Sequence, residues 1–316
     1  MIVSIKKILK TSTPLLFGAV LVWYSLSKIS INVLIGYFKE ANYEWIFLGL
    51  FFGILSHLSR AYRWKFMLDP LGFKPRFTNS VLAVLVGYLV NLAIPRAGEV
   101  SRAFVLTNYE QIPFEKGFGT IVAERIADLV MMLCIIIITL FVQFDFIYDL
   151  LTKNFDASKI SIGLIILTII CYVLYFFVKK ATSGILLKIK TFVIGLVEGV
   201  TSIFRMKNKV AFIFHTIFIW VMYVAMFWAT IPAISGLEVP FGGVLIGFIA
   251  GGFSIAATNG GIGLYPIAVA GALALFDIPS DPATAFGWIM WTAQTAMIII
   301  FGGLAFLFLP IYNKHK

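Results

Sequence analysis

Charged residues are scarce in this chain, since only 13% of its 316 residues are Asp, Glu, Lys or Arg. A soluble domain carries about twice that share. Hydrophobic residues make up 60% of the chain, the mean hydropathy is +0.98, and several apolar runs are long enough to cross a membrane. The composition therefore argues against a soluble protein and predicts a polytopic, all-α membrane protein. Apolar runs such as residues 129–140 lack the alternation of period two that a membrane barrel needs.

Cysteine is rare, and the common catalytic signatures are missing. The two cysteines, Cys134 and Cys171, both lie in apolar runs and are interpreted as packing residues. The sequence contains no phosphate-binding loop of an ATPase, no H-E-x-x-H and no G-x-S-x-G. We therefore expect no disulfide, metal, cofactor or catalytic residue. Any transport would be passive, coupled to an ion or driven by a partner.

The net charge of +10 comes from basic residues in short loops, which indicates cytoplasmic loops and anionic lipid rather than nucleic acid. If every apolar run crossed the membrane, most of these residues would lie outside. The distribution reverses when residues 78–95 enter from the cytoplasm and return, and residues 242–276 do the same from outside. Twenty of the 25 basic residues then lie in the cytoplasm, as do both termini. The six full spans of this prediction are residues 13–29, 44–59, 118–143, 160–178, 211–235 and 285–309.

Local chemistry favours the two re-entrant helical hairpins. The first is broken at Pro95 and Gly98, and the second at residues 257–263, which read A-T-N-G-G-I-G. Proline and glycine interrupt helices, and interrupted backbone at membrane depth survives only inside protein or facing water.

The predicted elements form a repeat. Residues 1–152 and 153–316 each show the order span, span, hairpin and span, with opposite orientations in the membrane. We interpret residues 1–316 as one membrane domain built as an inverted repeat, an arrangement that recurs in transporters. Residues 184–205 have apolar positions at helical spacing, which predicts an amphipathic helix on the inner membrane face.

Ionisable residues gather around the first break. Arg96, Glu99 and Arg102 follow Pro95 at intervals of three, so they share a face if this segment is helical. Charged groups at membrane depth are expensive and normally carry function. Two guanidiniums at a helix start would hold a lipid phosphate by paired hydrogen bonds, and Asn91 lies one turn before the break. The alternative is a structural Arg–Glu–Arg network that fixes the hairpin to its neighbours.

Glu124, Arg125 and Asp128 form a second charged group about twenty residues further on. Glu124 and Asp128 are four residues apart and share a helix face. Two carboxylates one turn apart would bind a cationic headgroup, carry a proton or pair with the arginines near the first break. These alternatives stay open.

Two more sets complete the candidate site. Arg60 and Arg63 lie at the cytoplasmic end of the second span, where arginines usually anchor a helix to lipid headgroups. Admission of an anionic lipid is the alternative. Asn259, Gly260 and Gly261 form the tip of the second hairpin, where glycines let a substrate or the first hairpin approach the backbone. A purely structural bend is the alternative there.

These motifs resemble the flippase-like family formed by the transmembrane region of lysylphosphatidylglycerol synthase, also called the multiple peptide resistance factor. The resemblance covers nearly the whole chain. Its matching pieces are R-A-Y-R-W (60–64), N-L-A-I-P-R-A-G-E-V-S-R (91–102), V-A-E-R-I-A-D (122–128) and T-N-G-G-I-G (258–263).

The resemblance implies a bacterial inner-membrane protein that moves a lipid or a lipid-linked group between leaflets. Full-length members continue into a soluble aminoacyl-transferring domain, which this chain does not show before Lys316, so we do not expect aminoacylation. Family members usually have a glutamate where Pro266 stands here, which weakens the case for a cationic headgroup. An anionic phospholipid and a polyprenyl phosphate both stay open as substrates.

We therefore predict a lipid flippase in which Arg96 and Arg102 take the phosphate, while Glu99, Glu124 and Asp128 balance or relay charge. An intramembrane transferase acting on a lipid-linked substrate, with one of these carboxylates as base, is the alternative. A membrane scaffold for a lipid-modifying enzyme is the third class. The expected partner is a membrane lipid, and a homo-oligomer or a neighbouring lipid-modifying enzyme stays open.

Overall fold

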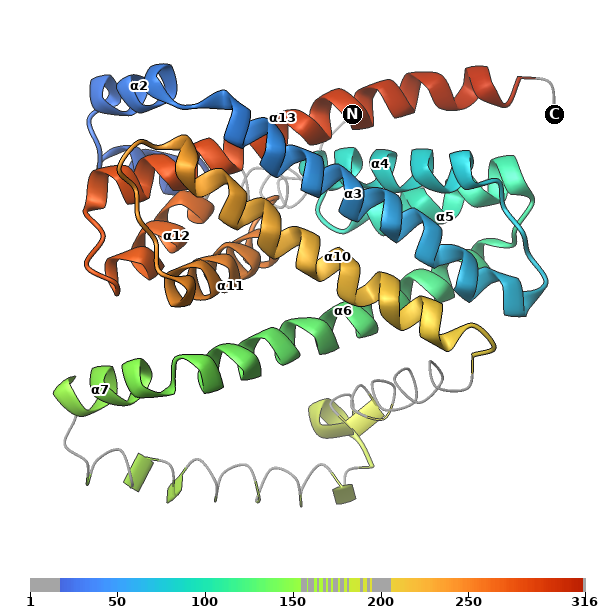
Figure 1. The fold of residues 1–316 in the computed structure, drawn as a ribbon. Helices are drawn as coiled ribbons and strands as arrows, with labels where there is room; N and C mark the ends of the chain where they lie inside the picture. Colours follow the sequence, from blue (N-terminus) through green and yellow to red (C-terminus); the bar gives the residue numbers. More distant parts are fainter. Residues whose placement is uncertain are drawn as a thin grey trace, which may run out of the picture. The chain divides into compact units, whose positions relative to one another are not determined.

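The structure, a computed structural model, describes residues 18–154 and 206–314, together with isolated positions and short stretches such as 182–187 between them. Every labelled element in these residues is a helix, as the all-α prediction requires (Figure 1). The α-helices are α2 (Ile31–Glu40), α3 (Tyr43–Leu68), α4 (Phe77–Ala93), α5 (Ala97–Glu110), α6 (Phe114–Val142), α7 (Phe144–Asn154), α10 (Lys209–Thr230), α11 (Phe241–Ala257), α12 (Leu264–Ala274) and α13 (Ser280–Tyr312). Two short 3-10 helices, η1 (Asp69–Leu71) and η2 (Ile231–Ala233), extend α3 and α10.

Four helices of the described chain are long and apolar enough to cross a membrane, and they coincide with four of the six predicted spans. A short helix, Gly18–Leu26, meets the prediction at residues 13–29, and it bends by 84° into α2. The span predicted at 160–178 and the amphipathic helix predicted at 184–205 lie outside the continuously described residues. The chain is thus a polytopic helical membrane protein. The four long segments are Tyr43–Leu71, Phe114–Val142, Lys209–Ala233 and Ser280–Tyr312.

The chain divides into two compact units. Unit 1 comprises Met1–Glu124 and Val210–Lys316, and unit 2 comprises Arg125–Lys209. The boundary falls within α6, so that Glu124 belongs to unit 1. The repeat halves inferred from the sequence pattern stay a prediction.

The first hairpin consists of α4 and α5, which lie side by side in unit 1 (Figure 1). Its arms pack closely because two glycines face each other. A Cβ on Gly98 would lie 2.6 Å from the Cγ of Asn91, and one on Gly87 would lie 2.6 Å from the Cγ of Arg102. The prediction of an entry and return within residues 78–95 is therefore wrong in its extent. That segment is only the first arm, and the return arm is α5, which the prediction left in the cytoplasm.

Polar side chains close the open end of this hairpin. Arg76, just before α4, donates from Nε to Glu110 Oε1 at 3.0 Å, and Asn79 donates to the same carboxylate oxygen. Asn79 also donates to Asn313 Oδ1 at 3.0 Å, at the end of α13. The chain therefore enters and leaves the hairpin at the same end of unit 1, beside the end of the last helix.

The second hairpin consists of α11 and α12, as the sequence predicts. Gly260, Gly261 and Gly263 all have positive φ angles in the break, where a side chain would be strained. Trp291 of α13 donates from Nε1 to the carbonyl oxygen of Gly260 at 2.8 Å. A Cβ on Gly260 would lie 2.9 Å from Leu92 Cδ2, near the end of α4. The breaks of the two hairpins therefore meet inside unit 1.

Several segments predicted to be cytoplasmic meet at one end of unit 1. The ends of α5 and α13 lie beside the start of α4, as described above. α10 packs antiparallel to α3, because Arg63 near the end of α3 donates to Thr216 near the start of α10.

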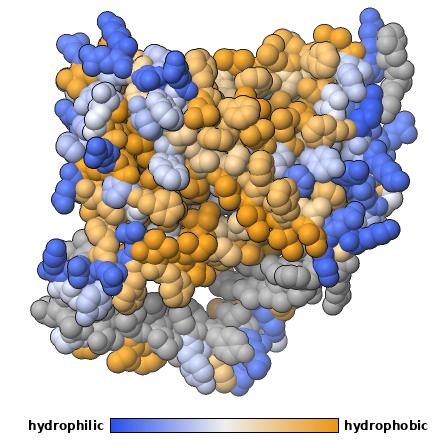
Figure 2. All heavy atoms as spheres, viewed as in Figure 1, coloured by the Kyte–Doolittle hydropathy of each residue, from blue (hydrophilic) through white to orange (hydrophobic). Residues whose placement is uncertain are grey.

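On the face drawn in Figure 2, hydrophobic side chains cover the middle of unit 1 and hydrophilic ones gather at its two ends. This distribution is that of a protein surrounded by lipid along its middle.

Candidate functional site

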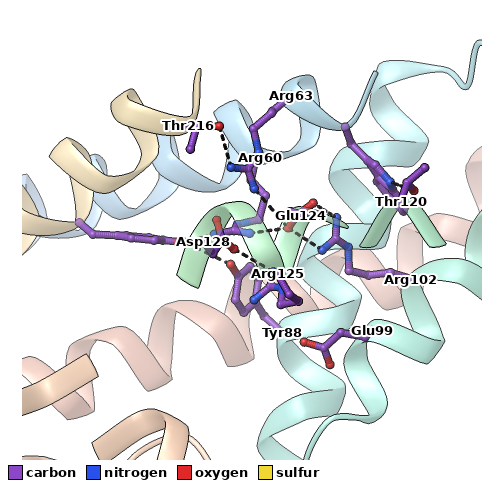
Figure 3. Close-up of polar contacts among 12 residues, drawn as sticks. Arg60, Arg63, Tyr88, Glu99, Arg102, Thr120, Glu124, Arg125, Asp128 and Thr216 are labelled. Carbon is purple, nitrogen blue, oxygen red and sulfur yellow. Dashed lines mark hydrogen bonds and ion pairs between the residues drawn. The ribbon is translucent and has the colours of Figure 1, made fainter. Parts of the chain in front are cut away.

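The candidate site is centred on the carboxylate of Glu124, which is 0% exposed. Arg102 of α5 donates from Nη1 to Oε1 and from Nη2 to Oε2, both at 3.0 Å (Figure 3). Arg60 of α3 donates from Nη1 to Oε1, and the Nη2 of Arg63 lies 3.6 Å from the same oxygen. Three guanidinium groups from two helices thus surround one carboxylate on a third. All four residues belong to unit 1.

The arginines of α3 do not lie at the lipid surface. Arg60 is 2% exposed and Arg63 is 0% exposed. The prediction that they anchor α3 to lipid headgroups is therefore wrong, because both guanidiniums point into the helix bundle. Arg63 donates to Thr216 Oγ1 at 3.0 Å and Arg60 donates to Tyr223 OH at 3.3 Å. Arg60 and Arg63 are nearly one helical turn apart, so both side chains project inward from the same face of α3.

Arg102 is held from two sides. Its guanidinium lies over the ring of Trp64, with 4.4 Å between the guanidinium carbon and the ring centroid. Trp64 is fixed in turn by a hydrogen bond from its Nε1 to Thr120 Oγ1 at 2.8 Å. Gly87 leaves room for the aliphatic stem of Arg102 beside α4. The Nε of Arg102 is buried without a hydrogen-bond partner among the described residues, so this side chain keeps a donor for another acceptor.

The second charged pair, Arg125 and Asp128, follows Glu124 directly on α6 and belongs to unit 2. Arg125 Nη2 lies 3.5 Å from Asp128 Oδ2. Asp128 is 9% exposed, and the Arg125 side chain is 42% exposed. Within unit 1, three arginines surround the single carboxylate of Glu124. These four residues keep a formal excess of two positive charges, which favours an anion rather than a cation as their ligand.

The predicted pairing of Arg96 with Arg102 is not formed. Arg96 precedes α5 in a left-handed conformation, with φ 62°, and is exposed, whereas Arg102 is buried against Glu124. The side chain of Asn91, on α4, caps the start of α5, because its Oδ1 accepts a hydrogen bond from the backbone N–H of Gly98 at 2.7 Å. Its Nδ2 lies 3.4 Å from Glu99 Oε2, so Glu99 is held at the first turn of α5, apart from the arginines around Glu124 (Figure 3). The helix start predicted to bind phosphate is thus already capped by a side chain.

The glycine tip of the second hairpin contacts the first hairpin rather than the arginines. Gly260 approaches Leu92, and Gly261 packs against the side chain of Tyr265, to which an added Cβ would come within 3.0 Å. Asn259 accepts the backbone N–H of Ile262 through its carbonyl oxygen at 3.3 Å. These contacts match the approach of the first hairpin to the glycine backbone, and they equally match a purely structural bend.

Three residues of the site were not predicted. Tyr88 and Tyr223 have hydroxyl oxygens 3.2 Å apart, and Thr216 accepts from Arg63. Each is a single polar side chain within an apolar run, a signal too common to stand out without the fold. No group of three His, Cys, Asp or Glu suited to a metal ion occurs in the described parts of the chain.

A comparison with models of protein families identifies the family of this chain. A family model for the lysylphosphatidylglycerol synthase TM region matches residues 12–302. The chain belongs to this family. Of the residues that carried the resemblance, Arg60, Arg63 and Arg102 meet around Glu124 in unit 1. The glycine tip of the second hairpin belongs to the same unit.

Two known proteins match parts of the chain. The UPF0104 membrane protein MJ1595 of Methanocaldococcus jannaschii is 31% identical over 125 residues, which are 39% of this chain and 37% of that protein. The protein named glycosyltransferase AglD of Haloferax volcanii is 31% identical over 77 residues, 24% of this chain and 12% of that protein. The matches thus span about a third of the first relative and an eighth of the second. No solved structure matches the chain.

Pro266, the position at which the resemblance leads us to expect a glutamate, has a packing role here. It lies buried in the first turn of α12. A Cβ on Gly287 of α13 would come within 2.6 Å of its Cα, so the two helices touch at this point. The position serves contact between helices and adds no charge to unit 1.

Proposed function

We propose that this protein moves the headgroup of an anionic lipid, a phospholipid or a polyprenyl-phosphate-linked group, between the leaflets of the plasma membrane. The observation that carries the proposal is the buried arginine cluster, defined as Arg60, Arg63 and Arg102 around Glu124. Charges at this depth are expensive to bury, and in membrane proteins they normally mark a substrate path. The excess of positive charge selects an anionic headgroup.

A phosphate has the geometry to replace the carboxylate of Glu124. Arg102 holds that carboxylate by two parallel hydrogen bonds of 3.0 Å, and guanidinium groups bind phosphate oxygens in the same paired way. In this proposal the phosphate takes the fork of Arg102 and Glu124 swings aside. When the lipid leaves, Glu124 returns as the resident counter-ion. The exchange prevents the phosphate from being trapped, because a carboxylate always competes for the same donors.

The two hairpins supply the passage in this proposal. α4 has 17 residues and is about 25 Å long, shorter than a hydrocarbon layer of roughly 30 Å. Its return through α5 to the same end supports a re-entrant hairpin. The second hairpin would enter from the opposite face, with the meeting point of the two breaks near the middle of the membrane. Arg96, Glu99, Asn259 and Gly261 would line the passage there, and both termini would be cytoplasmic.

Lipid translocation in reconstituted vesicles tests the proposal. Fluorescent phosphatidylglycerol in the inner leaflet is protected from a reductant added outside unless the protein exposes it. Arg102→Lys keeps the charge but loses the paired hydrogen bonds, which are each worth about 1.5–3 kcal/mol to a charged group. We expect the translocation rate to fall at least about tenfold.

The matched control is Lys116→Arg, the reverse exchange at an exposed position on α6. It should translocate lipid at the rate of the unmodified protein. An Arg102→Lys variant that is equally fast would contradict the assignment of the arginine cluster. Chemical conversion of the lipid by the purified protein would favour the transferase instead, and a stable co-purifying synthase would favour the scaffold.

A further inference from the structure

A cavity of about 260 Å³ opens in unit 1 between the end of α3 and the start of α4. Lys65 and Lys74 line it, together with the hydroxyl-bearing Tyr62 and Ser80. No carboxylate is among its lining residues. Both lysines are exposed, whereas Ser80 is 3% exposed and forms the cavity floor. The cavity therefore offers two mobile ammonium groups above a hydroxyl, a combination suited to a phosphate.

An apolar groove of about 270 Å³ adjoins this cavity. It runs between α3 and α10, where Leu55, Leu58, Phe214 and Phe218 line it. Ser59 and His215 also line it, and their polar atoms are turned to each other, with 2.8 Å between Oγ and Nδ1. Several of the apolar side chains face outward, since Leu58 is 37% exposed and Phe214 is 59% exposed. The groove is therefore open to the lipid that surrounds the middle of unit 1.

Tyr62 and Phe77 line both the cavity and the groove, so the two hollows are neighbours, and together they are called the depression below. The end of the depression at Lys65 and Lys74 is basic and lies beside the loop between α3 and α4. The end at Leu55 is apolar and lies further along α3 from that loop. A lipid has this same division along its length.

We propose that this depression is a binding site for one anionic glycerophospholipid. The phosphate lies between Lys65 and Lys74, and an acyl chain lies in the groove towards Leu55, which is ten residues from Lys65, or about 15 Å along the helix. The charge of the two lysines selects the lipid, and the groove provides contact with its chain.

This site is distinct from the arginine cluster. Its lysines are exposed to the surface, whereas Arg60, Arg63 and Arg102 are at most 4% exposed. The inference goes beyond the proposed function, because a lipid can bind here whether or not the protein translocates it. Binding is therefore measured in detergent, where no translocation takes place.

Native mass spectrometry of the purified full chain tests the site. Phosphatidylglycerol and phosphatidylcholine with identical acyl chains are titrated in parallel, and lipid-bound protein is counted for each. We expect phosphatidylglycerol to bind at least about tenfold more tightly, since each lysine near an anionic headgroup contributes about fivefold. The double variant Lys65→Gln/Lys74→Gln should lose this preference. The matched control, Lys116→Gln/Lys314→Gln, removes two exposed lysines outside the cavity and should keep it.

A second pair of variants tests the groove. Leu58→Trp fills it without changing charge and should lower the affinity for both lipids about tenfold, because the acyl chain loses its contact area. Leu304→Trp places the same side chain at an exposed position of α13 outside the groove and should change neither affinity. Equal binding of the two lipids by the unmodified protein would overturn the proposal. So would an unchanged preference in the double lysine variant, or unchanged affinity in Leu58→Trp.

Discussion

A carboxylate without solvent exposure, such as that of Glu124, persists in an apolar bundle only where opposite charge lies at hydrogen-bonding distance. Its partners come from different helices: Arg60 from α3 and Arg102 from α5. The charge pairing thus connects three helices of unit 1. Removal of the carboxylate would leave the three guanidiniums to repel one another in a medium that screens charge poorly.

Glu124→Gln should accordingly destabilise the protein. Breaking a buried ion pair by removing one partner costs about 3–5 kcal/mol, because the remaining charge stays buried and uncompensated. The measurement is the thermal unfolding midpoint of the purified protein in detergent. Glu115→Gln, an exposed position in the first turn of the same helix, is the control and should cost less than about 1 kcal/mol.

The same variants report on the anion that the arginine cluster accepts. Inorganic phosphate at millimolar concentration should restore part of the stability of Glu124→Gln, because a ligand that binds only the folded state stabilises it. It should affect Glu115→Gln no more than the unmodified protein. Absence of both the destabilisation and the phosphate effect would show that the arginine cluster neither holds the helices together nor binds phosphate.

The sequence singles out the charged residues of the site and offers the Arg102–Glu124 pair as one of three alternatives, but it does not reveal that Arg60 and Arg63 join them. Arg102 and Glu124 stood out because ionisable groups are rare in so apolar a chain. Arg60, however, is 64 residues away from Glu124 in the sequence. Its position at the end of a span has the same pattern as a headgroup anchor, and only the fold distinguishes an arginine that points inward from one that points into lipid.

At the scale of elements, the first hairpin depends on close backbone contact. α4 and α5 approach each other at Gly87 and Gly98, and a Cβ on Gly98 would collide with the carbonyl oxygen of Gly87 as well as with Asn91. Neither the carbonyl nor the capping side chain can move away freely, because Asn91 also accepts the N–H of Gly98. The position of Arg102 beside Gly87 depends on the same contact.

Gly98→Ala should therefore destabilise the protein even though alanine favours helices. Inserting a methyl group into a tightly packed contact costs about 1–3 kcal/mol. The control is Gly303→Ala in α13, where no atom lies within 4 Å of the added Cβ. That variant should gain about 0.5–1 kcal/mol from helix propensity alone. Unfolding midpoints in detergent separate the two, and equal midpoints would contradict the close packing of the hairpin arms.

The elements themselves were predicted where they are apolar and missed where they are polar. The second hairpin was recognised because both of its arms are apolar and its break is rich in glycine. In the first, the return arm α5 carries Glu99, Arg102 and Glu110, so its composition is that of a loop. Its polar side chains have partners inside the protein, such as Arg76 for Glu110, and the sequence pattern does not reveal these pairings. α2 is likewise a short helix in a segment read as a loop.

At the scale of the whole chain, the distribution of basic residues and the fold of unit 1 agree on which segments lie together. The end of α13 contacts Asn79 at the start of α4, and Glu110 at the end of α5 contacts Arg76. Lys74 and Lys116, which precede and follow the first hairpin, are both exposed. At the start of α13, about 50 Å away along that helix, the exposed Asp281 marks the opposite end.

Labelling of single introduced cysteines tests this arrangement in the membrane. With Cys134 and Cys171 replaced by serine, Lys74→Cys and Lys116→Cys should react with a membrane-impermeant maleimide only after the cells are permeabilised. Asp281→Cys should react on intact cells, because the positive-inside rule places the basic end in the cytoplasm. All three should react equally in permeabilised cells, which controls for exposure.

Labelling of Lys74→Cys and Lys116→Cys from different sides would mean that the chain crosses the membrane between them, so the first hairpin would not be re-entrant. Labelling of both from outside would keep the hairpin and reverse the orientation of the protein.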